Sequence, residues 1–119
     1  MSFQHQMNIN KIYFYYILKK MKIYETRIYD ERRQKIKLLD VIQFREKESK
    51  QTFNAKIIQL SYFKNFKDAI IDSGIKNILP NANSIEEGVK IYQSFPHKEG
   101  TYKEAANKYG VLRMKFELV

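Results

Sequence analysis

Hydrophobic and polar residues recur with helical spacing in a stretch near the start of the chain. The stretch begins after Asn10, which can cap a helix, and it runs to about Lys20. The inner face of this helix is expected to carry Ile12, Tyr13, Tyr16 and Ile17. Residues 1–9 precede it and fit either a leading strand or a loose N-terminus.

The period changes to two between Lys22 and Tyr29, which is typical of a strand. One face of this strand carries Tyr24, Thr26 and Ile28, and the other carries Glu25 and Arg27. Lys22 falls on the other phase or at the start of the strand, where its side chain can swing. The acid and the base on one face fit a surface salt bridge or a binding site, and the pattern leaves both open.

Three further strands are expected downstream. Residues 30–37 are charged and predict a turn or one short helical turn, followed by a strand over 41–45 with Ile42 and Phe44 inward. A longer strand over 52–62 changes phase at Ile57–Ile58, which predicts a β-bulge where the sheet bends. The last strand, 111–118, alternates Leu112, Met114, Phe116 and Leu118 with Arg113, Lys115 and Glu117.

Capping signals mark three helices in the second half of the chain. The first begins at Asn65, buries Phe66, Ala69 and Ile70, and ends near Gly74. Capping boxes at Ser84–Glu87 and Thr101–Glu104 begin the second and third, and Gly110 ends the third. The second helix buries Ile85, Val89 and Tyr92, and the third buries Tyr102, Ala105, Ala106 and Tyr109.

These elements predict an α+β fold, a small, mixed, partly closed β-barrel with several short helices packed around it. The 119 residues fit one domain spanning the whole chain, and no linker or internal repeat divides it. The oligomeric state stays open, and a monomer is assumed.

Composition changes this picture mainly through charge. Lysine and arginine number 22 against 13 acids, which leaves a formal net charge of +9. Nine of the basic residues and only three acids lie between Lys11 and Lys37. Such a concentration favours phosphate contacts and a polyanionic partner.

Several classes of protein are disfavoured by what the sequence lacks. It contains no cysteine, which excludes disulfides and thiolate metal sites and fits a cytoplasmic, reducing environment. The longest apolar run, Ile12–Leu18, is too short to span a bilayer, and no secretory signal pattern precedes it. His5 and His97 lack metal-ligand spacing, so we expect no metal and no cofactor.

Residues 20–27, KMKIYETR, resemble the signature of the ASCH family of the PUA-like superfamily, in which a glycine is followed by x-Lys-x-x-Glu-x-Arg. Residues 33–44 are similar to that family's basic stretch leading to Gly-Asp and a strand. Further landmarks follow in the family's order at Ile78–Pro80, Ser84–Val89 with Ile91–Tyr92, and Tyr109–Leu112. The resemblance covers roughly residues 10–118.

The resemblance implies a PUA-like barrel whose cleft binds RNA or a modified nucleotide. By that match Lys22, Glu25 and Arg27 would line the cleft, with Glu25 accepting a hydrogen bond from a base amino group. The expected rim of phosphate contacts is Lys20, Arg32, Arg33 and Lys35, with Lys37 beside them. Tyr92 and Tyr102 are the aromatic residues that we expect to stack on bases. The simpler interpretations are that the basic residues lie on a solvated turn and that the two tyrosines belong to the buried core.

Two positions depart from the family pattern. Lys20 and Leu39 stand where the family usually has glycine. A branched residue with positive φ costs about 1 kcal/mol or more, so we expect the turn before Asp40 to be reshaped. Lys20 would instead add a positive charge beside the site.

An enzymatic function is the alternative. Some proteins of similar fold cleave amides of acylated cytidines with a threonine, a lysine and a glutamate. Their lysine matches Lys22, but their threonine position is Glu25 here, and Thr26 should face the other side of the strand. Lys22 and Glu25 could also serve as an acid–base pair in a ribonuclease.

Overall fold

The computed structural model describes residues 2–98 and 100–119. Its strands are β1 (His5–Ile9), β2 (Tyr24–Ile28), β3 (Val41–Glu46), β4 (Thr52–Phe63), β5 (Pro96–His97), β6 (Gly100–Thr101) and β7 (Val111–Leu118). Its helices are α1 (Lys11–Leu18), the 3-10 turn η1 (Arg33–Lys35), α2 (Phe66–Ser73), α3 (Ile75–Ile78), α4 (Ile85–Gln93) and α5 (Tyr102–Tyr109).

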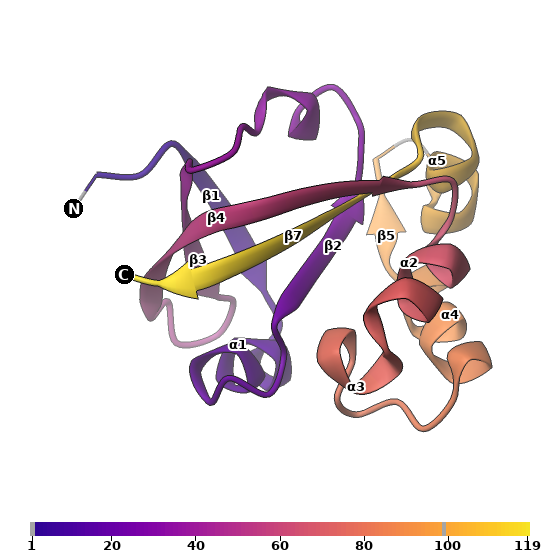
Figure 1. The fold of residues 1–119 in the computed structure, drawn as a ribbon, viewed down its shortest axis with the longest axis horizontal. Helices are drawn as coiled ribbons and strands as arrows, with labels where there is room; N and C mark the ends of the chain where they lie inside the picture. The colour runs from indigo at the N-terminus through magenta and orange to yellow at the C-terminus, as the bar shows by residue number, and fades with distance from the viewer. Residues whose placement is uncertain (1, 99) are drawn as a thin grey trace.

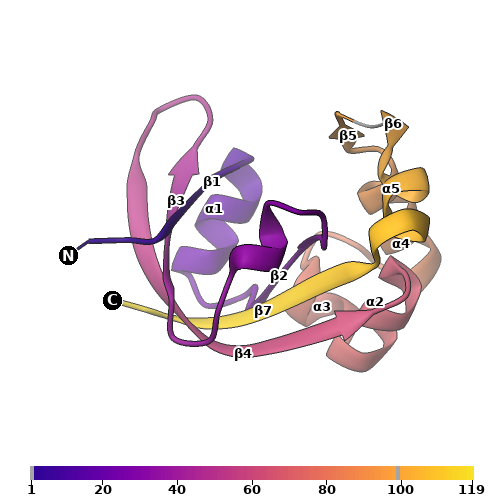
Figure 2. The same ribbon diagram turned by 90° about the horizontal axis from the view of Figure 1, so that it is seen from above.

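Five strands form one mixed sheet in the order β1-β3-β4-β7-β2. β1 runs parallel to β3, and the other neighbours are antiparallel. The sheet curls into a half-barrel whose two open edges are β1 and β2 (Figures 1 and 2). The predicted bulge is confirmed, because the β4–β7 register shifts between Ile57 and Gln59. The fold is therefore α+β, with several short helices around a half-barrel.

One side of the sheet packs against α1 through a chain of aromatic rings. Phe14 of α1 contacts Phe53, which contacts Phe44, which in turn contacts Phe116, with ring centroids 4.9–5.4 Å apart. Ile42 and Ile57 are fully buried beside them. The inner face of α1 differs from the prediction, since Phe14 is buried and Ile12 is 45% exposed.

The helices α2 to α5 gather beyond β2 and β7 (Figure 1). Their predicted N-caps are confirmed: the side chains of Asn65, Ser84 and Thr101 each accept a hydrogen bond from the backbone N–H three residues on. Arg113 was expected to alternate outward, but α2 covers that face. Its guanidinium is buried between Asp72, at 2.7 Å, and the ring of Tyr24.

The short elements α3, β5 and β6 have no clear signal in the sequence, whereas β1 matches the leading-strand alternative for residues 1–9. Asn10 precedes α1 without a side-chain cap hydrogen bond. None of the helices in the described part of the chain is long and apolar enough to cross a membrane.

The turn before Asp40 keeps the backbone that glycine favours, so the expectation that it is reshaped was wrong. Leu39 has φ 72° and Lys20 has φ 61°, both in the left-handed region. The N–H of Leu39 donates to the carbonyl of Ile57, and this bond holds the turn against β4. The Leu39 side chain is 62% exposed and gains little packing in return.

Replacing Leu39 with glycine should therefore stabilise the protein. The substitution relieves a left-handed strain of about 1 kcal/mol, and it removes little buried surface. We expect the free energy of unfolding in urea to rise by about that amount. Leu39→Ala keeps the Cβ atom and should not be stabilised, so equal effects of glycine and alanine would contradict this account.

Candidate functional site

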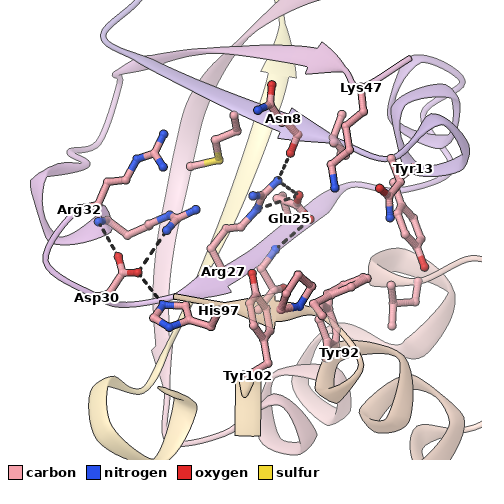
Figure 3. Close-up of a pocket in the computed structure, with 18 of the residues that line it drawn as sticks. Asn8, Tyr13, Glu25, Arg27, Asp30, Arg32, Lys47, Tyr92, His97 and Tyr102 are labelled. Atoms are coloured by element: carbon pink, nitrogen blue, oxygen red, sulfur yellow. Dashed lines mark hydrogen bonds and ion pairs between the residues drawn. The ribbon is translucent and has the colours of Figure 1, made fainter. Parts of the chain in front are cut away.

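A cavity of about 400 Å³ opens between the free edges of the half-barrel and the helical layer. β1 and the start of α1 form one wall of the cavity, and α4, α5 and residues 95–98 form the opposite wall. β2 also contributes residues to the lining. Figure 3 shows Asn8 and Lys47 entering from one side, and Tyr92 and Tyr102 entering from the helical side. The lining comprises Met7, Asn8, Ile9, Asn10, Tyr13, Lys22, Glu25, Thr26, Arg27, Asp30, Arg32, Arg33, Lys47, Leu79, Tyr92, Phe95, Pro96, His97, Lys98 and Tyr102.

The carboxylate of Glu25 lies between the buried Lys22 and the partly buried Arg27 in this cavity. Its Oε2 accepts from Nε and Nη2 of Arg27, at 3.2 and 2.9 Å. Its Oε1 lies 3.3 Å from Nζ of Lys22 and accepts from the backbone N–H of Thr26 at 3.2 Å. A carboxylate offers about four acceptor positions, so Glu25 is fully occupied.

Both cations extend the Glu25 cluster to other parts of the fold. Nη2 of Arg27 also donates to the carbonyl of Asn8 in β1 at 3.0 Å, which links the two open edges of the sheet. Nζ of Lys22 donates to the carbonyl of Ile78 at the end of α3. Lys22, which was expected to be able to swing, is only 2% exposed and fixed in place.

The pKa values of the three groups follow from burial and mutual attraction. Burial alone would raise the pKa of Glu25, but Lys22 and Arg27 outweigh it and hold that pKa below its usual value. Burial lowers the pKa of Lys22, although Glu25 opposes the change. Burial also acts to lower the pKa of Arg27, and Glu25 reverses this, so the net shift is upward.

A second buried carboxylate, Asp30, organises the mouth of the cavity. Its Oδ2 lies 3.0 Å from Nε2 of His97 and 3.2 Å from Nη1 of Arg33. Burial acts to raise the pKa of Asp30, but His97 and Arg33 prevail and lower it. Asp30 thereby joins the loop after β2 to β5.

Most residues expected at a site lie on this cavity: Lys22, Glu25, Arg27, Arg32, Arg33, Tyr92 and Tyr102. Lys20 and Lys35 do not line it, and both are exposed on turns outside it. The expectation that Glu25 accepts a hydrogen bond from a base does not fit the observed arrangement, because four donors of the protein already surround this carboxylate.

The two tyrosines are built into the helical layer. Phe66 stacks on Tyr92 with centroids 4.4 Å apart and lies parallel to Tyr102 at 5.7 Å. The edge of Phe95 packs against both tyrosines. Tyr92 is 2% exposed, so its ring is part of the core.

Thr26 lies on the face of β2 opposite Glu25 and Arg27, as the alternation predicts, and pairs with Arg113 in β7. The cavity nevertheless wraps around the open edge of β2, so Thr26 lines it as well. Sequence reasoning also missed Asn8, Lys47, His97 and Lys98. These residues come from β1, the β3–β4 turn, β5 and the position just after β5, and nothing local in the sequence places them beside β2.

The charge of the lining is predominantly positive. Six lysine or arginine side chains face two carboxylates, and Arg32, Lys47 and Lys98 are exposed at the opening. No group of three metal-ligating side chains occurs among the described residues. Anionic ligands are therefore favoured at the mouth of the cavity.

The solved structures that match this chain include two hypothetical archaeal proteins of the same fold. The chain is 35% identical to hypothetical protein PH0355, with a TM-score of 0.83, over 97% of this chain and 98% of that one. It is 29% identical to protein PF0455 from Pyrococcus furiosus, with a TM-score of 0.75, over 98% of each chain. No protein-family model and no curated protein matches the chain.

Replacing Glu25 with glutamine should destabilise the protein by about 3 kcal/mol at pH 7, because the buried Lys22 and the partly buried Arg27 lose their counter-ion. The folded pKa of Glu25 is lowered, so its contribution is complete above the usual value of 4.5 and is lost as the pH falls below it. Urea unfolding of wild type and Glu25→Gln at pH 7 and pH 3 measures the loss of stability and its dependence on pH. A difference between wild type and Glu25→Gln that stays constant between the two pH values would contradict the charge pairing.

Proposed function

Since the chain belongs to the family of hypothetical protein PH0355, whose name states no activity, we propose a function from the chemistry of the cavity. The protein binds RNA and holds one single-stranded or modified nucleotide in this cavity. The observation that carries the proposal is the division of the lining into exposed cations at the mouth and, within, aromatic and uncharged polar groups beside the mutually paired charges of Lys22, Glu25 and Arg27. Exposed cations bind phosphates, and aromatic and uncharged polar groups bind bases.

The dimensions and charge of the site support a nucleotide ligand. A volume of about 400 Å³ lies within the range of roughly 300–1,000 Å³ typical of cavities for small organic ligands. The cations at the mouth can follow a phosphate backbone that continues beyond the cavity. The absence of cysteine fits an intracellular ligand of this kind.

The ASCH resemblance supports the same function, and we propose that the chain is an ASCH-type domain of the PUA-like superfamily. The three signature residues Lys22, Glu25 and Arg27 all line the cavity. Lys20 and Leu39, at the family's glycine positions, both have positive φ, which is the backbone conformation that glycine serves.

Fluorescence anisotropy with labelled single-stranded RNA, duplex RNA and duplex DNA tests this function. Single-stranded RNA should bind most tightly, with an affinity that falls as salt increases. The double variant Arg32→Gln/Lys47→Gln removes two exposed cations on different sides of the cavity. If each contacts a phosphate, the slope of log K against log salt should flatten by about 1.4.

The matched control is Lys35→Gln/Lys37→Gln, which removes the same charge from outside the cavity lining. It should weaken binding much less than the cavity variant. Equal losses in the two variants, or equal binding of all three polymers, would mean that the basic surface is unspecific and the proposed site is wrong.

A second candidate function is amide cleavage on an acylated cytidine. It is favoured by the Thr26 hydroxyl, which lines the cavity together with the Lys22–Glu25 pair. Chromatography of free cytidine released from an acylated cytidine measures it. Turnover that Thr26→Val abolishes and Thr26→Ser retains would establish this reaction, and no release by the wild type would exclude it for that substrate.

A further inference from the structure

Two hydroxyl groups beside the cavity are buried without hydrogen-bond partners. Thr26 and Tyr92 are each 2% exposed, and neither Oγ1 of Thr26 nor the hydroxyl of Tyr92 bonds to any described residue. The two hydroxyls lie close together, because a hydrogen-bond interaction with Thr26 partly offsets the rise in the pKa of Tyr92 that burial and Glu25 cause. Their oxygens still do not form a hydrogen bond of ordinary geometry. Buried hydroxyls without partners are unusual and costly.

Most hydrogen-bonding positions of the charged groups nearby are already occupied by other groups of the protein. All four acceptor positions of Glu25 are occupied, and Nζ of Lys22 is held by Ile78 and Glu25. Nε and Nη2 of Arg27 are committed to Glu25 and Asn8. The hydroxyls of Thr26 and Tyr92 are, by contrast, buried without a hydrogen-bond partner.

The cations that can meet a phosphate lie elsewhere. Arg32, Lys47 and Lys98 are exposed at the opening, whereas Tyr92 belongs to the helical wall (Figure 3). The apolar surface of Leu79 and the rings of Tyr13 and Phe95 also line the cavity. A flat, uncharged ring suits this interior better than a phosphate, which would meet the ionised carboxylate of Glu25 there.

We propose that the site has a fixed polarity: a nucleobase enters edge first and bonds to the hydroxyls of Thr26 and Tyr92, and its phosphate stays at Arg32. This inference rests on the proposed nucleotide function and specifies which end of the nucleotide is read. Each hydroxyl can donate or accept, so the pair fits the adjacent donor and acceptor of a pyrimidine edge. Because hydroxyl groups rotate, cytosine and uracil are both accommodated.

The first test uses the protein without a ligand. If the hydroxyls lack partners, Tyr92→Phe and Thr26→Val each remove a buried polar group at no loss of a hydrogen bond. The melting temperature of each variant should equal or exceed that of the wild type. A fall of several degrees would show that the hydroxyls are already bonded within the protein, and it would overturn the inference.

The second test compares cytidine 5′-monophosphate, cytidine and ribose 5-phosphate by calorimetric titration. Tyr92→Phe and Thr26→Val should each weaken the binding of cytidine 5′-monophosphate about tenfold and leave ribose 5-phosphate unchanged. Arg32→Gln should weaken both phosphates and leave cytidine unchanged. Tyr16→Phe, which removes a hydroxyl outside the cavity lining, is the control and should change none of them.

Binding of cytidine 5′-monophosphate no tighter than ribose 5-phosphate, or an unaltered affinity in Tyr92→Phe, would overturn the polarity. The anisotropy measurements separate this failure from failure of the proposed function. If Arg32→Gln/Lys47→Gln weakens RNA binding while Tyr92→Phe does not, RNA is bound without the hydroxyl pair. If RNA does not bind at all, both proposals fail.

Discussion

The ion pairs of Glu25 are the interaction on which the geometry of the site depends. The carboxylate of Glu25 and its two cations lie between β1 and β2, the two strands that would pair if the barrel were closed. Arg27, on β2, donates a hydrogen bond to the carbonyl of Asn8 on β1. Lys22 ties the same cluster to Ile78 in the helical layer. Such a cluster contributes little net stability compared with a hydrophobic core, but removing one partner is costly. It therefore keeps the two open edges at a fixed separation and maintains a cavity.

The cavity has features that a purely structural ion-pair cluster would not require. The central charges are nearly all satisfied within the protein, while Thr26 and Tyr92 keep buried hydroxyls without partners. Proteins commonly retain such unfavourable groups where a ligand completes them, at some cost in stability. The same division explains why the exposed cations lie at the opening, where a phosphate can reach them without crossing the carboxylate of Glu25.

Local patterns in the sequence were sufficient to predict much of the fold. Alternation identified β2, the change of phase at Ile57 identified the bulge, and the caps at Asn65, Ser84 and Thr101 marked three helices. Features that depend on strand order could not be predicted. They include the burial of Arg113 under α2 and the positions of Asn8 and Lys47 across from β2.

Lys22, Glu25 and Arg27 line the cavity, but their mutual pairing could not be predicted from the sequence. Whether Glu25 is open to a ligand depends on four donors, three of which belong to Lys22 and Arg27. Contacts with distant segments orient both of these side chains. Leu39 likewise shows that a branched residue can adopt the backbone conformation that glycine favours when a bond to Ile57 holds the turn.

The central claim, that RNA occupies the cavity between β1, β2 and the helical layer, is tested most directly by nuclear magnetic resonance of the nitrogen-labelled protein. Single-stranded RNA would be titrated while the backbone amide signals are followed. The account predicts that the largest shifts map to Asn8, Thr26, Arg33 and His97, which line the cavity from separate segments. Shifts concentrated instead around Lys20 and Lys35, outside the cavity, or no shifts at all, would contradict it.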